Sequence, residues 1–392
     1  GKIAREAADA ASTKDKPRFV LGSLGPGTKL PSLGHTTYQK LKDAYYTAAK
    51  GLLDAKSDAL LVETTQDLLQ AKAAVNGCRQ AIEEVDFDVV LIAQVTVETT
   101  GTMLLGSEIG AALNALEPLE IDLIGLNCAT GPAEMSEHLR YLSKFANCAI
   151  SVMPNAGLPI LGAKGAEYPL GPKELADALE TFVGDYGIGL IGGCCGTTPE
   201  HLAAVVEKMS TKPFKERGAV LDPGASSLYQ YVPFRQDNTY LAIGEKTNAN
   251  GSRAFRDALV AEDWEKCVEI ARDQIRDGAH MLDLSVDYVG RDGAADMYEI
   301  ASRFATASTL PIVLDSTEPN VIKAGLEALG GRCVINSVNY EDGDGPTSRF
   351  ARIMPLVKEH GASVVALTID EEGQARTAEW KLRVARRLIE DL

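Results

Sequence analysis

The chain has 392 residues, of which 45% are hydrophobic and 24% charged, so it is long enough for two globular domains and too apolar for a disordered protein. Its formal net charge of −16 disfavours a surface for nucleic acid or anionic membranes, which requires clustered Lys and Arg. No stretch approaches the roughly 18 consecutive apolar residues of a membrane span, and residues 1–13 lack the apolar core of a signal peptide, so a cytoplasmic location is predicted.

Strand-length apolar runs alternate with longer amphipathic stretches in the first half, which is typical of parallel βα units. Helices are predicted after Asp67 and from Pro199, because apolar residues at helical spacing follow a start signal at both places. Six strands are expected, about two fewer than a closed eight-stranded barrel contains. The expected strands are residues 18–24, 59–63, 89–95, 123–128, 149–154 and 189–193.

A break in periodicity separates the two halves of the chain. Prolines, glycines and serines interrupt residues 213–238, which predicts a linker between one domain at 1–212 and another at 239–392. In the second domain helices are predicted at 263–276 and 320–329, and the chain ends inside a helix at Leu392. The predicted fold is α/β, with two successive (β/α)8 TIM-type barrels that are both incomplete in this chain. The expected strands of the second domain are residues 240–245, 280–284, 311–314, 333–336 and 363–368.

The strongest chemical signal in the sequence is Gly192-Gly-Cys-Cys-Gly-Thr-Thr-Pro-Glu-His at the end of a predicted strand. Neighbouring residues of a strand point to opposite faces, so Cys194 and Cys195 can hold one metal only if the backbone turns there, as the surrounding glycines permit. Cys128 ends an earlier strand, and the strand ends of a parallel barrel meet at one face. Three thiolates leave one place of a tetrahedral zinc site open to a substrate thiol, which is the arrangement of a catalytic zinc.

Other interpretations of these cysteines remain open on the residues alone. The Cys194–Cys195 pair also fits plain buried packing or a disulfide between neighbours. Asn155, in Pro154-Asn-Ala-Gly at a further strand end, favours the zinc site. Seven scattered cysteines, an odd number, do not form a secreted disulfide framework, and Cys78 and Cys148 are predicted to be ordinary core residues.

The phrases Gly-Leu-Asn-Cys, Pro-Asn-Ala-Gly and Gly-Gly-Cys-Cys-Gly-Thr-Thr-Pro-Glu-His, in this order, resemble the homocysteine methyltransferase family. The resemblance implies that Cys128, Cys194 and Cys195 bind zinc and that Asn155 occupies the fourth place until homocysteine displaces it. Glu63, in Leu-Val-Glu-Thr-Thr, matches a strand-end acid that receives the amino group of homocysteine; a structural hydrogen-bond partner is the alternative. The nucleophile is then the zinc-activated substrate thiol, and no side chain is expected as an acid or base.

Polar residues also end the strands of the second half. Glu245, Asp283, Asp315 and Asn336 stand at or just after four successive predicted strands, so they are expected to converge on one mouth, as in a small-molecule site. Carboxylates and amides suit a pterin, which presents an amino group and a ring N–H beside a carbonyl. Each acid taken alone fits equally well as the cap of the following helix.

These second-half phrases resemble the pterin-binding domain of folate-dependent and corrinoid methyltransferases. The resemblance implies a methyltetrahydrofolate pocket that includes Asn248 in Glu-Lys-Thr-Asn, with Asp315 and Asn336 as the direct pterin contacts. Asp370-Glu-Glu-Gly-Gln-Ala is similar to the loop that follows the family's fifth strand. The other implied pocket residues are Glu245 and Asp283.

Joined in this order, the two halves resemble the cobalamin-dependent methionine synthase family. The resemblance implies methyl transfer from 5-methyltetrahydrofolate through cobalamin to homocysteine. The opening strands of the first barrel, the last strands of the second, and the cobalamin-binding and activation domains are expected outside this chain, so the chain alone should be incomplete for turnover. A betaine- or S-methylmethionine-dependent homocysteine methyltransferase fits the first half alone, and a non-catalytic binding fragment is a further alternative.

Overall fold

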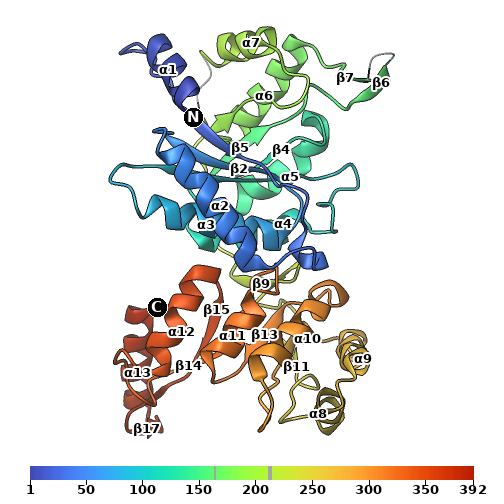
Figure 1. Cartoon of the computed structure of the whole chain (residues 1–392), viewed down its shortest axis with the longest axis vertical. Helices are drawn as coiled ribbons and strands as arrows, with labels where there is room; N and C mark the ends of the chain where they lie inside the picture. The colour runs from blue at the N-terminus through green and yellow to red at the C-terminus, as the bar shows by residue number, and fades with distance from the viewer. Residues whose placement is uncertain (163–164, 211–213) are drawn as a thin grey trace. The chain divides into compact units, whose positions relative to one another are not determined.

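The computed structural model describes residues 1–162, 165–210 and 214–392 (Figure 1). It contains two compact units, one of residues 1–31 and 35–222 and the other of residues 32–34 and 223–392. The boundary expected after residue 212 lies outside the described residues. Of the helices in the described part of the chain, none combines the length and the apolar character needed to cross a membrane.

The first unit is built on a six-stranded parallel sheet whose neighbours in space are also neighbours in sequence. All six strands predicted from the sequence are present, and the last is reduced to two residues because glycines flank it. Alternate residues such as Leu60, Ile124 and Val152 are fully buried beneath the helices. The strands, in sheet order, are β1 (Leu21–Leu24), β2 (Ala59–Thr65), β3 (Val90–Val95), β4 (Leu123–Asn127), β5 (Ala149–Met153) and β8 (Leu190–Ile191).

Helices separate successive strands of this sheet along the chain (Figure 1). The predicted start signal at Asp67 is confirmed, because its side chain accepts a hydrogen bond from the Leu69 N–H at 2.9 Å. The helix predicted from Pro199 is also present. The helices are α1 (Lys2–Ala11), α2 (Tyr38–Leu53), α3 (Leu68–Ile82), α4 (Ile109–Leu116), α5 (Pro132–Phe145), α6 (Pro172–Tyr186) and α7 (Pro199–Met209), with short 3-10 turns at Pro31–Leu33 and Glu117–Leu119.

Three of these helices begin with a proline. Each of α5, α6 and α7 has proline as its first residue, where the missing N–H is not needed and the fixed φ suits a helix. The Glu134 carboxylate accepts a hydrogen bond from the Gly131 N–H at 3.1 Å, and His201 Nδ1 accepts one from the Thr198 N–H at 3.2 Å. These local contacts therefore set the residue at which α5 and α7 each begin, and so the residue at which the preceding loop ends.

The second unit contains a five-stranded parallel sheet, also in sequence order, and the five predicted strands are confirmed. The α/β class is therefore confirmed for both units, although neither sheet closes on itself within the described residues. The strands are β11 (Ile243–Gly244), β12 (Met281–Leu284), β13 (Ile312–Asp315), β14 (Val334–Val338) and β15 (Ser363–Ala366). The helices are α8 (Arg253–Val260), α9 (Trp264–Arg276), α10 (Gly293–Ala307), α11 (Pro319–Leu326), α12 (Arg349–His360) and α13 (Ala378–Asp391).

Short antiparallel hairpins were not expected from the sequence. The most important lies inside the predicted linker, where β9 (Gly224–Ser226) pairs with β10 (Tyr231–Pro233). Ala225 and Val232 of this hairpin pack with Met281 and Val313 of the second sheet, so the second unit begins before the expected residue 239. The other hairpins are β6 (Ile160–Gly162) with β7 (Gly165–Glu167), and β16 (Ile369–Asp370) with β17 (Gly373–Gln374).

Candidate functional site

The three cysteines singled out in the sequence lie together at the carboxyl edge of the first sheet. Cys128 directly follows β4, and Cys194 and Cys195 follow β8, two strands away in the sheet. The Sγ of Cys195 is 3.8 Å from that of Cys128 and 4.0 Å from that of Cys194. All the cysteines are free, so the alternative of a disulfide between Cys194 and Cys195 is not realised.

The spacing of these sulfurs fits a zinc ion. A tetrahedral zinc with Zn–S bonds of about 2.3 Å places its sulfur ligands about 3.8 Å apart. All three Sγ atoms lie within 4.8 Å of one another, and Cys195 is the exposed member of the group. The donor set therefore suits three thiolate ligands with a fourth place accessible to another ligand.

The backbone around the cysteines turns sharply, as the sequence required. Cys128 and Ala129 both have positive φ angles, 61° and 56°, which side-chain-bearing residues rarely adopt outside functional sites. Gly196 follows the cysteine pair with a φ of 78°, which confirms the expected glycine turn. Asn155, only 2% exposed, fixes the pair further, because its Oδ1 accepts a hydrogen bond from the Cys195 N–H at 3.1 Å.

Mutual contact changes the acidity of the thiols. Hydrogen bonding from Cys194 is the main reason that the pKa of Cys128 is lowered to about 6, and the Ala129 N–H and the Asn155 side chain add to the effect although burial opposes it. The same contact raises the pKa of Cys194. The lowered pKa of Cys128 favours its thiolate, which is the form that binds a metal.

Asn127 connects this cluster to Glu63, a role that the sequence did not predict. Its Oδ1 accepts a hydrogen bond from the Thr64 N–H at 2.8 Å, and its Nδ2 lies 3.4 Å from Glu63 Oε2 and 4.0 Å from Cys194 Sγ. The Ser23 hydroxyl also donates to the Glu63 carboxylate. Glu63 thus lies near the thiols with structural partners of its own, and its substrate role stays a prediction. The sequence could have indicated this role of Asn127, because the residue directly precedes Cys128.

In the second unit the predicted pocket residues meet around Asn248. Its Nδ2 donates hydrogen bonds of 2.9 Å both to Asp283 Oδ2 and to Asp315 Oδ2, which joins the ends of β12 and β13. Its Oδ1 accepts from the Asn250 and Gly251 N–H groups. These contacts bring three of the predicted side chains to one mouth of the sheet.

The remaining two predicted pocket residues lie beside this group. Asn336 is the direct neighbour of Asp315 in the sheet register between β13 and β14. The negative charge of Glu245 contributes to raising the pKa values of both Asp283 and Asp315. All five residues therefore belong to one edge of the second sheet.

Comparison with known proteins gives the family of the chain. A family model described as homocysteine S-methyltransferase matches residues 1–209, more than half of the chain. The chain belongs to the homocysteine S-methyltransferase family. A second model, described as pterin binding enzyme, matches residues 244–391. Both resemblances inferred from the motifs are thereby confirmed.

Two curated relatives of this homocysteine S-methyltransferase family member match all of the chain. They are the methionine synthases of Mycobacterium tuberculosis, 65% identical over 390 residues, and Mycobacterium leprae, 64% identical over 395 residues. The chain spans only 33% of the length of each. The structure of the homocysteine methyltransferase MmuM from Escherichia coli, in its apo form, is 23% identical, with 53% of this chain and 69% of that chain covered and a TM-score of 0.42.

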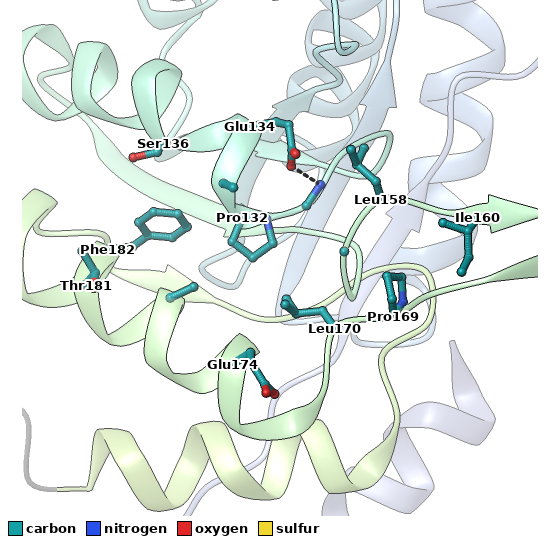
Figure 2. Close-up of a pocket in the computed structure, with 14 residues that line it drawn as sticks. Pro132, Glu134, Ser136, Leu158, Ile160, Pro169, Leu170, Glu174, Thr181 and Phe182 are labelled. Atoms are coloured by element: carbon teal, nitrogen blue, oxygen red, sulfur yellow. Dashed lines mark hydrogen bonds between the residues drawn. The ribbon is translucent and has the colours of Figure 1, made fainter.

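The first unit of this family member also has an apolar cavity of about 650 Å³ between α5 and α6 (Figure 2). Phe182 and Leu170 line it, and Glu134 and Glu174 point to its edge. Glu134 is bonded to the start of α5, and the Glu174 carboxylate lies against Gly171 at the start of α6. The Glu134 carboxylate therefore serves the start of α5, and none of the residues that line the cavity is one of the three cysteines.

Buried and half-buried polar residues that the sequence analysis missed support the pocket of the second unit. The Thr247 hydroxyl donates to the Asp283 carbonyl at 2.5 Å, and Gln274 Nε2 donates to Thr247 Oγ1 at 3.1 Å. Asp287 accepts a hydrogen bond from the Ser316 hydroxyl at 2.9 Å. Gln274 is 3% exposed on the inner face of α9. A polar residue at an otherwise apolar position of this helix could have indicated a buried hydrogen-bonding role.

Asp283 gives a pH-dependent prediction for the stability of the second unit. Burial, aided by the charges of Asp315 and Glu245, raises the pKa of Asp283 to about 6 although Asn248 hydrogen-bonds to it. The folded state therefore keeps a proton that the unfolded chain loses near pH 4, and stability falls as pH rises from about 4 to about 6. Asp283→Asn, which retains an oxygen for Asn248, should raise the free energy of unfolding by about 2–3 kcal/mol at pH 7 and by almost nothing at pH 4.

Denaturant titrations at several pH values, followed by tryptophan fluorescence, measure this effect in the second unit, because both tryptophans, Trp264 and Trp380, lie there. Asp257→Asn, which changes an exposed carboxylate on α8, is the control and should show no comparable rise. An Asp283→Asn gain that is the same at pH 4 and pH 7 would contradict the assignment.

Proposed function

We propose that the chain provides the two substrate sites of a cobalamin-dependent methionine synthase. The reaction transfers a methyl group from 5-methyltetrahydrofolate through cobalamin to homocysteine, giving methionine and tetrahydrofolate. The identity of 65% to a methionine synthase and the succession of the two family matches support this proposal. Cobalamin-binding and activation domains would belong to the two thirds of the relatives that the chain does not span.

The observation that carries the proposal is the sulfur cluster, with its 3.8 and 4.0 Å separations and its exposed side. Cys128, Cys194 and Cys195 would hold zinc, which when bound supplies the charge that keeps a substrate thiol ionised near neutral pH. Asn155 would occupy the fourth place until homocysteine displaces it. Glu63 would receive the amino group of homocysteine.

The second unit would bind methyltetrahydrofolate at the edge where Asn248 joins Asp283 and Asp315. Asp315 and Asn336 would contact the pterin, because a carboxylate and an amide match its adjacent donors and acceptor. Glu245 would line the same pocket. Burial removes water from these carboxylates, so they lack some of their hydrogen-bond donors. An N–H group of the pterin would therefore be a favourable donor to them.

The architecture of the intact protein is part of the same proposal. Each parallel sheet would form part of a separate (β/α)8 barrel, and the β9–β10 hairpin inside the expected linker 213–238 would belong to the second. Sequential strand order in both sheets supports this, because barrels of this type add strands in chain order. The cytoplasmic location remains a prediction from the sequence.

An assay of the full-length gene product with homocysteine tests the reaction. Methionine formation should require both cobalamin and methyltetrahydrofolate, because the pterin site supplies the only methyl donor in the proposal. Methionine formed from betaine or S-methylmethionine without cobalamin would overturn the proposal in favour of the simpler methyltransferases. Binding of homocysteine without any turnover by the intact protein would instead indicate a non-catalytic binding protein.

A further inference from the structure

Gln274 is a buried polar side chain on the otherwise apolar inner face of α9. It is 3% exposed, and its buried neighbours on the helix are Cys267, Val268, Ile270 and Ala271. A buried amide lowers stability unless its oxygen and its nitrogen both find hydrogen-bond partners. The contacts that Gln274 makes therefore explain why a polar residue stands at this position.

Both polar atoms of the Gln274 amide bond to the loop that follows β11. Its Oε1 accepts a hydrogen bond from the Lys246 N–H at 2.6 Å, and its Nε2 donates to Thr247 Oγ1 at 3.1 Å. The Lys246 N–H can only donate, so one orientation of the amide satisfies both contacts. A Cβ on Gly244 would lie 2.7 Å from Gln274 Oε1, so glycine at this position leaves the space that the amide occupies.

The loop that Gln274 holds leads directly into the proposed folate pocket. Thr247 is fully buried, and its hydroxyl donates to the Asp283 carbonyl at 2.5 Å. Asn248, the next residue, donates at 2.9 Å to a carboxylate oxygen of both Asp283 and Asp315. A continuous chain of hydrogen bonds therefore runs from α9 through the loop to the carboxyl ends of β12 and β13.

We propose that Gln274 is a positioning residue of the folate site that acts through Asn248. By bonding to the Lys246 N–H and the Thr247 hydroxyl, it fixes the loop on which Asn248 stands. Asn248 in turn holds one oxygen of each neighbouring carboxylate, so the orientation of both acids is set before the pterin arrives. The inference rests on the proposed function, because it concerns how the pterin site of that proposal is held in place.

Isothermal titration of the full-length gene product with methyltetrahydrofolate tests this role. Gln274→Met keeps the length and the apolar bulk of the side chain but removes both of its hydrogen bonds to the loop. It should weaken folate binding roughly five- to thirtyfold, the range expected for the loss of one or two buried hydrogen bonds. Unchanged folate affinity in Gln274→Met would overturn the inference.

A double-variant cycle distinguishes positioning through Asn248 from general support of the fold. If Gln274 acts through Asn248, adding Gln274→Met to a protein that already carries Asn248→Ala should cost little further affinity. The double variant should then bind methyltetrahydrofolate within about twofold of Asn248→Ala alone. Losses that multiply would overturn the inference, because they would mean that Gln274 affects binding independently of Asn248.

Gln274→Glu supplies an independent measurement, because its hydrogen bonding depends on pH. The charged carboxylate can only accept, so it draws the Thr247 hydroxyl away from the Asp283 carbonyl, whereas the protonated acid can donate to Thr247 as the amide does. Burial raises the pKa of a carboxyl, so the affinity lost relative to the unchanged protein should shrink as pH falls from about 8 to about 5. The loss in Gln274→Met, compared at the same pH values, should stay constant. A loss in Gln274→Glu that is the same throughout this range would overturn the inference.

Gln236→Met is the matched control, because the Gln236 amide donates to the Pro233 carbonyl of its own turn at 2.6 Å instead of to the loop after β11. Its folate affinity should equal that of the unchanged protein. An unchanged full-length protein that does not bind methyltetrahydrofolate would contradict the proposed function itself. Binding by the unchanged protein that Gln274→Met leaves intact would overturn only the role of Gln274.

Discussion

Replacement of Cys128 by serine should remove zinc from the chain. The thiolate of Cys128 is one of three sulfurs at metal-ligand spacing, and contact with Cys194 lowers the pKa of its thiol. A serine hydroxyl stays protonated near neutral pH and leaves two thiolates, which are too few for a stable zinc site. Elemental analysis after dialysis should show about one zinc per chain before the change and little after it.

Cys148→Ser is the matched control for this experiment. Cys148 is a half-buried free cysteine at the start of β5, outside the sulfur cluster, so its replacement should leave the zinc content unchanged. Cys194→Ser should behave like Cys128→Ser. Stoichiometric zinc in both of these cluster variants would show that the three sulfurs do not hold the metal.

Asp315→Ala should weaken methyltetrahydrofolate binding about ten- to a hundredfold. The change removes the proposed acceptor of the pterin donors and one of the two carboxylates that hold Asn248 in place. Loss of a charge-assisted hydrogen bond in a buried site costs about 1–3 kcal/mol, which corresponds to this range of affinity. Isothermal titration of the full-length gene product with methyltetrahydrofolate measures the change.

Asp315→Asn separates the charge from the shape of the side chain. It keeps an oxygen that can accept from Asn248 but loses the carboxylate, so its affinity should lie between those of the unchanged protein and Asp315→Ala. Zinc content should be the same in all three proteins, because the cysteines belong to the other unit. Unaltered folate affinity in Asp315→Ala would place the pterin elsewhere.

The order of strands and helices along the chain was predictable, because short apolar runs of strand length alternate clearly with longer stretches of helical periodicity. All eleven strands expected in the two parallel sheets are present, within a few residues of their expected ends. The hairpins were not predictable, because three-residue strands such as Gly224–Ser226 contain no alternation of apolar and polar residues. Their pairing depends on tertiary contacts, here the packing of Ala225 against Met281 and Val313.

The candidate sites were predictable where reactive side chains stand at the ends of strands in one parallel sheet. Cys128, Cys194 and Cys195 stand at strand ends, so parallel topology alone brings them together. Asn127 was not predicted, because its contacts with Thr64 and Glu63 depend on how the end of another strand of the sheet is placed. Gln274 was missed for a similar reason, since its partner Thr247 comes from a distant part of the chain.

The proline starts of α5 and α7 affect how the chain would acquire a metal. Cys128 lies three residues before Gly131, and Cys195 lies three residues before Thr198, so each ligand loop is short and ends at a fixed helix cap. Ordering a flexible backbone costs about 1–2 kcal/mol per residue, and here that entropy is lost when the helices form. Metal association would then need little rearrangement of the ligand loops. In contrast to a zinc finger, whose folding depends on its ion, this unit would fold first and bind its metal second.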